Sequence, residues 1–261
     1  MEPHFQFYQS HRIKYYTCGK GETLVLLHGY QADSRIWELL IPLLQDHYSL
    51  LIPDLPGHGE SPLIQSTNSM EFLAEIVFSL VMSSGSRGVT LAGHSMGGYV
   101  ALSFAEKYPT LTDRLVLLNS HPFEDSITKI LARNRESEII QSGKKEILLR
   151  SFVQNNFCPK NILSLKNEID LATHIALSQP ENGMLADLAG MMARTNKVAV
   201  LLKKRIHAAF ILGRDDKRIP INLFDTLDKN SLKISWINDC GHMSMLEKPE
   251  EVARIILENS F

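Results

Sequence analysis

Gly93-His94-Ser95-Met96-Gly97 says more about this chain than any other stretch of its sequence. Residues 88–92, just upstream, form a short apolar run that is typical of a β-strand. Residues 98–108, just downstream, carry apolar side chains at helical spacing and end before Pro109. A serine between a strand and a helix lies on a turn that is too tight for side chains at the flanking positions. Glycine at both ends relieves those clashes and exposes the hydroxyl, so the pattern predicts an accessible Ser95 hydroxyl.

Strand and helix patterns alternate on both sides of this turn. The further strands are predicted at residues 12–17, 23–27, 49–52, 114–118, 206–212 and 232–237, and the further helices at 34–45, 70–82, 222–228 and 249–258. Asp33 is placed to cap the first of these helices. Near-continuous apolar strands that are separated by helices indicate a parallel sheet covered on both faces. The expected fold class is therefore α/β, with a mostly parallel, doubly wound sheet.

The alternation stops at His121 and resumes only after Lys204. The intervening sequence is helical and amphipathic, without a clear strand. We expect residues 121–204 to be a helical cap, inserted after the sixth strand, and residues 1–120 and 205–261 to form one core domain.

Two groups of residues within the insertion have alternative interpretations. The mixed-charge segment from Arg133 to Arg150 is expected to be a solvated helical face, because acidic residues offset its lysines and arginines. Met184, Met191 and Met192 are expected to be core residues, and the alternative is an apolar pocket for an acyl or ring group.

Polar residues lie shortly after the ends of four predicted strands. They are His28-Gly29-Tyr30, Ser95, the adjacent Asp215 and Asp216, and His242. Because ligand and catalytic groups gather at the carboxyl ends of parallel strands, we expect them to lie close together. A serine hydroxyl needs a base, and an imidazole serves best when a carboxylate fixes its tautomer. The chain supplies serine, acid and histidine in that order, and either aspartate could be the acid.

The motifs resemble those of the α/β-hydrolase fold family, in its serine-nucleophile branch with a helical cap. The matching segments are His28–Tyr30 (oxyanion loop), Asp54–Ser61 (D-x-x-G-x-G-x-S), Gly93–Gly97 (nucleophile elbow), Gly213–Pro220 (G-x-x-D-x-x-x-P) and Gly241–Glu250 (histidine loop). They span nearly the whole chain. Because the family hosts many reactions, the motifs support the fold more strongly than any one chemistry.

The resemblance implies a role for each matching residue. Ser95 would be the nucleophile, His242 the base and Asp216 the orienting acid, and the G-x-x-D spacing with its downstream proline favours Asp216 over Asp215. An oxyanion hole would be formed by the backbone N–H groups of Tyr30 and Met96.

Three further histidines are candidates for pocket lining. His28 and His94 are both expected to be mainly structural, His28 by shaping the oxyanion loop and His94 by packing beneath the nucleophile. His121 opens the insertion and could line the pocket.

The implied activity is that of a cofactor-free serine hydrolase, which cleaves a small carboxylic ester or related acyl substrate through an acyl-enzyme. The same triad would also serve C–C bond hydrolysis, enol-lactone hydrolysis, perhydrolysis or a lyase-like step of menaquinone biosynthesis. A second alternative is a ligand-binding receptor or scaffold that has little turnover.

The composition argues against several other classes of protein. The net charge is -2, from 27 Lys and Arg against 29 Asp and Glu, so we expect no binding to nucleic acid. No apolar stretch approaches the ~20 residues of a membrane span. The three cysteines are odd in number and far apart, which favours a reducing cytoplasm. No pair of Cys or His residues has the spacing of metal ligands, so we expect no metal. The protein is expected to be a cytoplasmic monomer or weak homo-oligomer.

Overall fold

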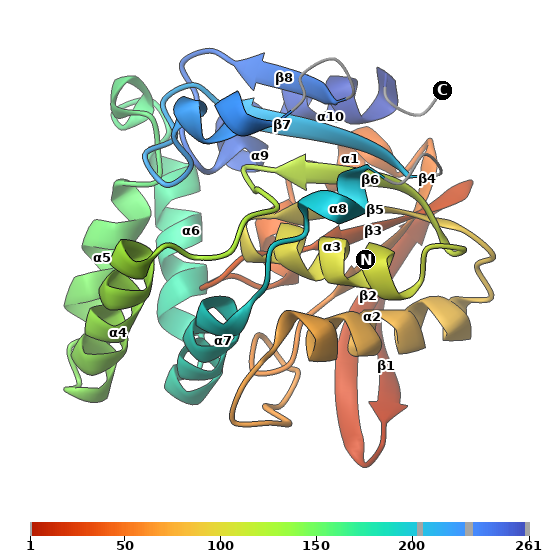
Figure 1. Cartoon of the computed structure of the whole chain (residues 1–261), viewed down its shortest axis with the longest axis horizontal. Helices are drawn as coiled ribbons and strands as arrows, with labels where there is room; N and C mark the ends of the chain where they lie inside the picture. The colour runs from red at the N-terminus through yellow and green to blue at the C-terminus, as the bar shows by residue number, and fades with distance from the viewer. Residues whose placement is uncertain (1, 203–205, 228–231, 259–261) are drawn as a thin grey trace.

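A single eight-stranded sheet forms the centre of the computed structural model, which describes residues 2–202, 206–227 and 232–258. The strand order is β1-β2-β4-β3-β5-β6-β7-β8 (Figure 1). The strands are β1 (Glu2–Tyr8), β2 (His11–Gly19), β3 (Glu22–Leu27), β4 (Tyr48–Pro53), β5 (Val89–His94), β6 (Thr112–Leu118), β7 (His207–Gly213) and β8 (Lys233–Ile237). β2 pairs antiparallel with β1 and with β4, and the other neighbours are parallel.

Helices cover both faces of the sheet (Figure 1). One face carries α2 (Met70–Ser84), α3 (Met96–Lys107) and the short α8 (Val198–Leu201), and the other carries α1 (Ile41–Leu44), α9 (Ser244–Glu247) and α10 (Pro249–Glu258). The predicted α/β fold, with a mostly parallel, doubly wound sheet, is thus confirmed.

Four longer helices form an insertion between β6 and β7, at one side of the sheet (Figure 1). They are α4 (Ile127–Gln141), α5 (Lys145–Gln154), α6 (Lys166–Ser178) and α7 (Glu181–Ala193). The predicted helical insertion is therefore present, although its expected end at Lys204 lies outside the described residues.

The predicted helix over residues 34–45 is wrong in detail. The chain instead forms a 3-10 turn, η1 (Ser34–Trp37), and then the four-residue α1. Pro42 explains the break, because it has no N–H to donate to Glu38 in a continuous helix. Asp33 caps η1 as predicted, since its side chain accepts a hydrogen bond from the Arg35 N–H.

Other differences from the prediction are smaller. β1 and α9 were not expected, and the predicted helix over residues 222–228 is a 3-10 turn, η3 (Ile221–Thr226), with residue 228 outside the described residues. A further 3-10 turn, η2 (Pro159–Asn161), follows α5.

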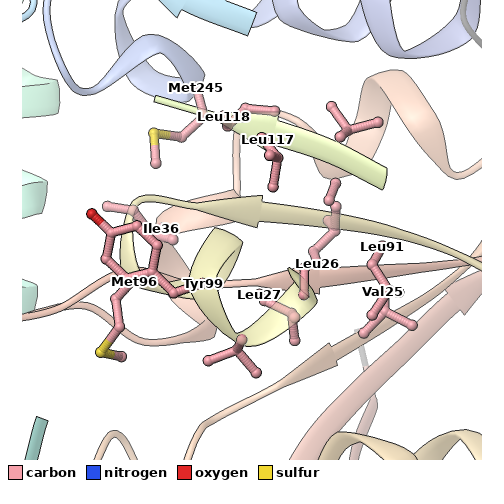
Figure 2. Close-up of a cluster of buried hydrophobic side chains, with 14 of the residues drawn as sticks. Val25, Leu26, Leu27, Ile36, Leu91, Met96, Tyr99, Leu117, Leu118 and Met245 are labelled. Atoms are coloured by element: carbon pink, nitrogen blue, oxygen red, sulfur yellow. The ribbon is translucent and has the colours of Figure 1, made fainter. Parts of the chain in front are cut away.

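The hydrophobic core lies on both faces of the central strands. Figure 2 shows side chains of β3, β5 and β6 packed with residues from η1, α3 and α9. Leu24, Val25, Leu26 and Leu27 of β3 are all fully buried. A strand that is buried on both faces needs apolar residues at successive positions, which is the pattern that its sequence shows.

The insertion contacts the core closely through α7. A Cβ atom added at Gly183 would lie 2.0 Å from the Gly57 carbonyl oxygen, and one at Gly190 would lie 1.7 Å from the Asn68 carbonyl oxygen. Beside these contacts, the His58 Nε2 and Asp187 Oδ2 atoms are 3.2 Å apart, and both side chains are fully buried. Only glycine allows the helix to approach the loop this closely.

In the part of the chain that the structure describes, no helix is long and apolar enough to cross a membrane.

Candidate active site

Ser95 lies on the sharp turn between β5 and α3. Its backbone has φ 52° and ψ −114°, a strained conformation for a residue with a side chain. A Cβ atom at Gly93 would lie 2.3 Å from the Gly97 carbonyl oxygen, and one at Gly97 would lie 2.2 Å from the Leu27 carbonyl oxygen. The two glycines are therefore sterically required, as the sequence pattern predicts.

Three predicted residues meet at the carboxyl edge of the sheet. The His242 Nε2 and Ser95 Oγ atoms are 3.0 Å apart, and the His242 Nδ1 and Asp216 Oδ2 atoms are 2.8 Å apart. Asp216 follows β7 and His242 follows β8. Asp215, the alternative acid, is exposed to solvent. Of the two aspartates, Asp216 is thus the one whose carboxylate reaches the histidine.

Four donors surround the Asp216 carboxylate. Its Oδ2 accepts from His242 and from the Asn119 amide, and its Oδ1 accepts from the backbone N–H groups of Arg218 and Ile219, at 2.8 and 3.1 Å. Burial by itself would raise the pKa of Asp216. The His242 ring and these hydrogen bonds outweigh burial and lower the pKa below 3.8. The carboxylate is therefore held ionised and fixed in direction toward the ring.

Two residues that directly follow β6 support this arrangement, and the sequence analysis did not single them out. The Asn119 amide donates to Asp216 Oδ2 at 2.9 Å and to the Gly241 carbonyl oxygen at 3.0 Å. The Ser120 hydroxyl donates to the Ser95 carbonyl oxygen at 2.7 Å. Their position at the carboxyl end of a strand could have identified them as site residues, because the other candidates lie at equivalent positions.

The loop that carries His242 is tied to the insertion. The His242 N–H donates to the Asn156 carbonyl oxygen at 2.7 Å. Glu247, which is buried, accepts from the N–H groups of Gly241 and Cys158 and from the side chain of Asn161, at 2.8 to 2.9 Å. One carboxylate thus joins the histidine loop to residues 156–161.

The residues of the predicted oxyanion hole lie on either side of Ser95. Met96 is the first residue of α3, where backbone N–H groups have no partner within the helix. Tyr30 follows Gly29, and a Cβ atom at Gly29 would lie 3.2 Å from the Ser95 Cβ atom. The loop before Tyr30 therefore passes directly against the serine, and only glycine leaves the room.

The three candidate histidines are all buried, and their hydrogen bonds define their tautomers. His28 accepts from the Leu55 N–H through Nε2, so its Nδ1 donates to the Gly29 carbonyl oxygen. His94 donates through Nε2 to the His242 carbonyl oxygen at 2.9 Å. His121 accepts from the Phe123 N–H through Nδ1, so its Nε2 donates to the Tyr99 hydroxyl at 3.1 Å.

Burial keeps these rings neutral. It lowers the pKa of His94 to about 3, with the neighbouring His242 as a second cause. It also lowers the pKa of His121 to about 3, with Arg194 as the second cause, and it lowers the pKa of His28. None of the three rings is therefore charged at neutral pH.

A cavity of about 110 Å³ borders Ser95 and His242. Its wall combines core residues with side chains of the insertion, among them Tyr30, Ile36, Tyr99, Phe152 and Met191. His94 and His121 also line it, whereas His28, the third candidate for pocket lining, does not. Met184 is buried away from this wall.

The expected solvated face on the mixed-charge segment from Arg133 to Arg150 is wrong at Arg133 and Glu136. Arg133 is buried and pairs with Asp125, at 2.5 Å between Nε and Oδ2. Lys129, Arg133 and Glu136 all line the cavity. Asp125 lies outside the mixed-charge segment, so the composition of that segment gave no sign that Arg133 has a buried partner.

Within residues 2–202, 206–227 and 232–258, no group of three or more His, Cys, Asp or Glu side chains is arranged to hold a metal ion.

Most of the chain matches a known protein family. Residues 24–255 match the family described as "Alpha/beta hydrolase family".

Individual relatives have low sequence identity to this chain, but their alignments cover nearly all of it. The chain is 27% identical to the pimeloyl-[acyl-carrier protein] methyl ester esterase of Methylococcus capsulatus, covering 93% of this chain and 96% of the relative. It is 23% identical to the enzyme of the same name from Pseudoalteromonas atlantica, covering 95% and 98%. A thermophilic esterase from Thermogutta terrifontis, solved with malate bound, superposes with a TM-score of 0.90 at 25% identity, covering 99% of this chain and 97% of the esterase.

Proposed function

We propose that this chain, which belongs to the alpha/beta hydrolase family, is a carboxylic ester hydrolase that cleaves a small acyl ester through an acyl-enzyme on Ser95. The predicted resemblance to the family is confirmed by the match over residues 24–255. The similarity to two methyl ester esterases and to a thermophilic esterase supports the choice of an ester among the bonds that the family cleaves.

One observation carries the proposal: the continuous hydrogen-bonded line from Asp216 through His242 to Ser95, with contacts of 2.8 and 3.0 Å. Such a line lets the imidazole take a proton from the hydroxyl while the carboxylate stabilises the resulting cation. We assign Ser95 as nucleophile, His242 as general base and Asp216 as the orienting acid.

In the first half-reaction the Ser95 oxygen attacks the ester carbonyl carbon, and its proton moves to His242 Nε2. The carbonyl oxygen becomes an oxyanion, which we assign to the backbone N–H groups of Met96 and Tyr30. The N-terminus of α3 adds a partial positive charge at Met96. When the tetrahedral intermediate collapses, the bond to the alcohol oxygen breaks and His242 returns the proton to that oxygen.

In the second half-reaction a water molecule attacks the acyl group on Ser95. His242 removes a proton from the water and then gives it to the Ser95 oxygen as the carboxylic acid leaves. Every proton therefore passes through one imidazole, and the chemistry needs no further cofactor.

We also propose that residues 121–204 act as a cap domain that selects the substrate. Most of the cavity's charged side chains, including Lys129, Arg133 and Glu136, come from this insertion. Substrate choice would then depend on the cap, and the reaction on the core.

The test uses 4-nitrophenyl butyrate with the wild type, Ser95→Ala and Ser142→Ala, the last being an exposed serine of the insertion. We expect Ser95→Ala to lose turnover and to lose labelling by a fluorophosphonate probe, while its melting temperature stays close to wild type. Ser142→Ala should match the wild type in both assays. Undiminished turnover in Ser95→Ala would overturn the assignment, and so would labelling of that variant at the wild-type rate.

A further inference from the structure

Among the described residues, two basic side chains that form no ion pair line one part of the Ser95 cavity. Lys129 from α4 and Arg218 from the loop after β7 are both part of the wall. In the described part of the chain, no carboxylate lies within 4 Å of the Lys129 ammonium. No carboxylate of the described residues therefore pairs directly with this lysine, and Asp125 and Glu136 act on it only from a longer distance.

Arg218 is held in place by uncharged groups. Its Nε donates to the Asn156 Oδ1 atom at 2.8 Å, and its guanidinium lies 3.5 Å from the centre of the Phe152 ring. Among the described residues, it forms no ion pair. These contacts fix the side chain while the remaining N–H groups stay available to a ligand.

The surrounding charges leave an excess of positive charge. Arg133 and Arg194 share a single carboxylate, that of Asp125. Glu136, which lines the cavity, accepts a hydrogen bond from the Gln31 amide at 3.0 Å. Four cations (Lys129, Arg133, Arg194 and Arg218) thus stand against two acids (Asp125 and Glu136).

The Asp216 carboxylate adds a third negative charge near Arg218 and reduces this excess to one positive charge. Both oxygens of Asp216 are occupied by four donors, among them the His242 ring. The excess positive charge acts on Lys129, whose pKa is lowered first by burial and then by the neighbouring Arg133 and Arg218 cations. A bound anion would offset both the cost of burying the ammonium charge and the repulsion from the neighbouring cations.

We propose that the cavity binds an acyl ester that carries a second, ionised carboxylate, the half-ester of a small dicarboxylic acid. The carboxylate would lie between Lys129 and Arg218, and the ester carbonyl at Ser95. A planar guanidinium matches a carboxylate, and the cavity of about 110 Å³ favours a short acyl chain. This inference rests on the proposed ester hydrolysis, and it names the class of ester.

The experiment compares two esters of matched shape, monomethyl succinate and the uncharged methyl 4-methylpentanoate. Hydrolysis is followed by proton release at constant pH. We expect the wild-type kcat/KM to be about tenfold or more higher for the charged ester, since a hydrogen bond to a charged group supports a difference of that order. Equal values for the two esters would overturn the proposal.

Variants then locate the anion site. Lys129→Met and Arg218→Met should each lower the ratio of the two kcat/KM values about tenfold, mainly through KM for the charged ester. Lys166→Met, at an exposed lysine on α6 away from the cavity, should keep the wild-type ratio. An unchanged ratio in both cavity variants would contradict the assignment of these cations.

Failure of the ester chemistry is distinguished by a binding measurement. If the wild type hydrolyses neither of these esters nor 4-nitrophenyl butyrate, the proposed function is wrong, and calorimetric titration of Ser95→Ala with monomethyl succinate decides the anion site. Binding that Lys129→Met weakens about tenfold in this background supports the site, and no measurable binding refutes it. Inorganic phosphate that binds more tightly than monomethyl succinate would refute the choice of a carboxylate.

Discussion

The amide nitrogen of Asn119 lies 2.9 Å from the Asp216 carboxylate and 3.0 Å from the Gly241 carbonyl oxygen. It thereby connects the end of β6 to both the acid and the histidine loop. Asn119 is fully buried and has a φ of 43°, a left-handed conformation in which asparagine is among the better tolerated residues. One side chain therefore orients the two partners of the proposed proton relay.

Replacing Asn119 by glycine should lower kcat about tenfold, because the amide that orients Asp216 and Gly241 is lost while glycine still accepts the positive φ. Asn119→Ala should lower kcat similarly and unfold more easily, because alanine is strained at that φ. Steady-state kinetics and urea denaturation measure the two effects. A wild-type kcat in Asn119→Gly would contradict the positioning role.

The close approach of α7 to the core makes a stability prediction. Gly190→Ala places a methyl group 1.7 Å from the Asn68 carbonyl oxygen, so the helix must move, and the free energy of unfolding should fall by about 3 kcal/mol. Gly143→Ala is the control, since its added Cβ atom meets nothing within 4 Å although its φ is +74°. That variant should lose only about 1 kcal/mol. Equal losses in a denaturation experiment would count against tight docking.

Asp187 should give the protein's stability a pH dependence of known sign. Burial raises the pKa of Asp187 from 3.8 to about 7, so the folded state holds a proton that the unfolded chain releases between those values. Its stabilising contribution is therefore fully present below about pH 4 and is lost as pH rises toward 7. The shift corresponds to at most about 4 kcal/mol.

Asp187→Asn isolates this effect, because asparagine cannot titrate. His58 acts in the opposite direction, since burial lowers its pKa to about 4, but it is present in both proteins and its contribution should largely cancel. The free energy of unfolding of the wild type minus that of Asp187→Asn should fall between pH 4 and 7. A difference that stays flat with pH would show that Asp187 is not the titrating group.

Glu247 is predicted to support activity from a distance. Glu247→Gln puts an amide where the carboxylate accepts three hydrogen bonds, so we expect a loss of about 2 kcal/mol in unfolding free energy and a several-fold lower kcat. Glu250→Gln, at an exposed position on α10, is the matched control and should change neither quantity. A variant at Glu247 that matches this control would contradict the role.

The parts of the site that sequence alone predicts are those with local steric causes. Gly93 and Gly97 mark the turn at Ser95, because any side chain there would meet backbone atoms within 2.3 Å. The spacing of Asp216 within its loop is equally local, since Oδ1 accepts from N–H groups two and three residues later. These motifs could therefore be identified before the fold was known.

The parts that sequence did not predict depend on distant partners. Asn119 and Asp216 are 97 residues apart, and a strand-end asparagine has the same sequence pattern whether its amide faces water or a carboxylate. Arg133 belongs to a segment whose mixed charge is typical of a solvated face, yet it is buried and forms an ion pair with Asp125. The break at Pro42 shows the same limit, because apolar spacing predicts a helix that one missing N–H prevents.

The bonds that Glu247 and Asn156 make across the histidine loop restrict how a substrate can enter. A hinged opening of the insertion at residues 156–161 would pull on the His242 backbone and withdraw the imidazole from Ser95. A substrate could therefore not enter by that route while His242 stays in contact with Ser95. An opening by that route would therefore separate the two side chains on which the proposed hydrolysis depends.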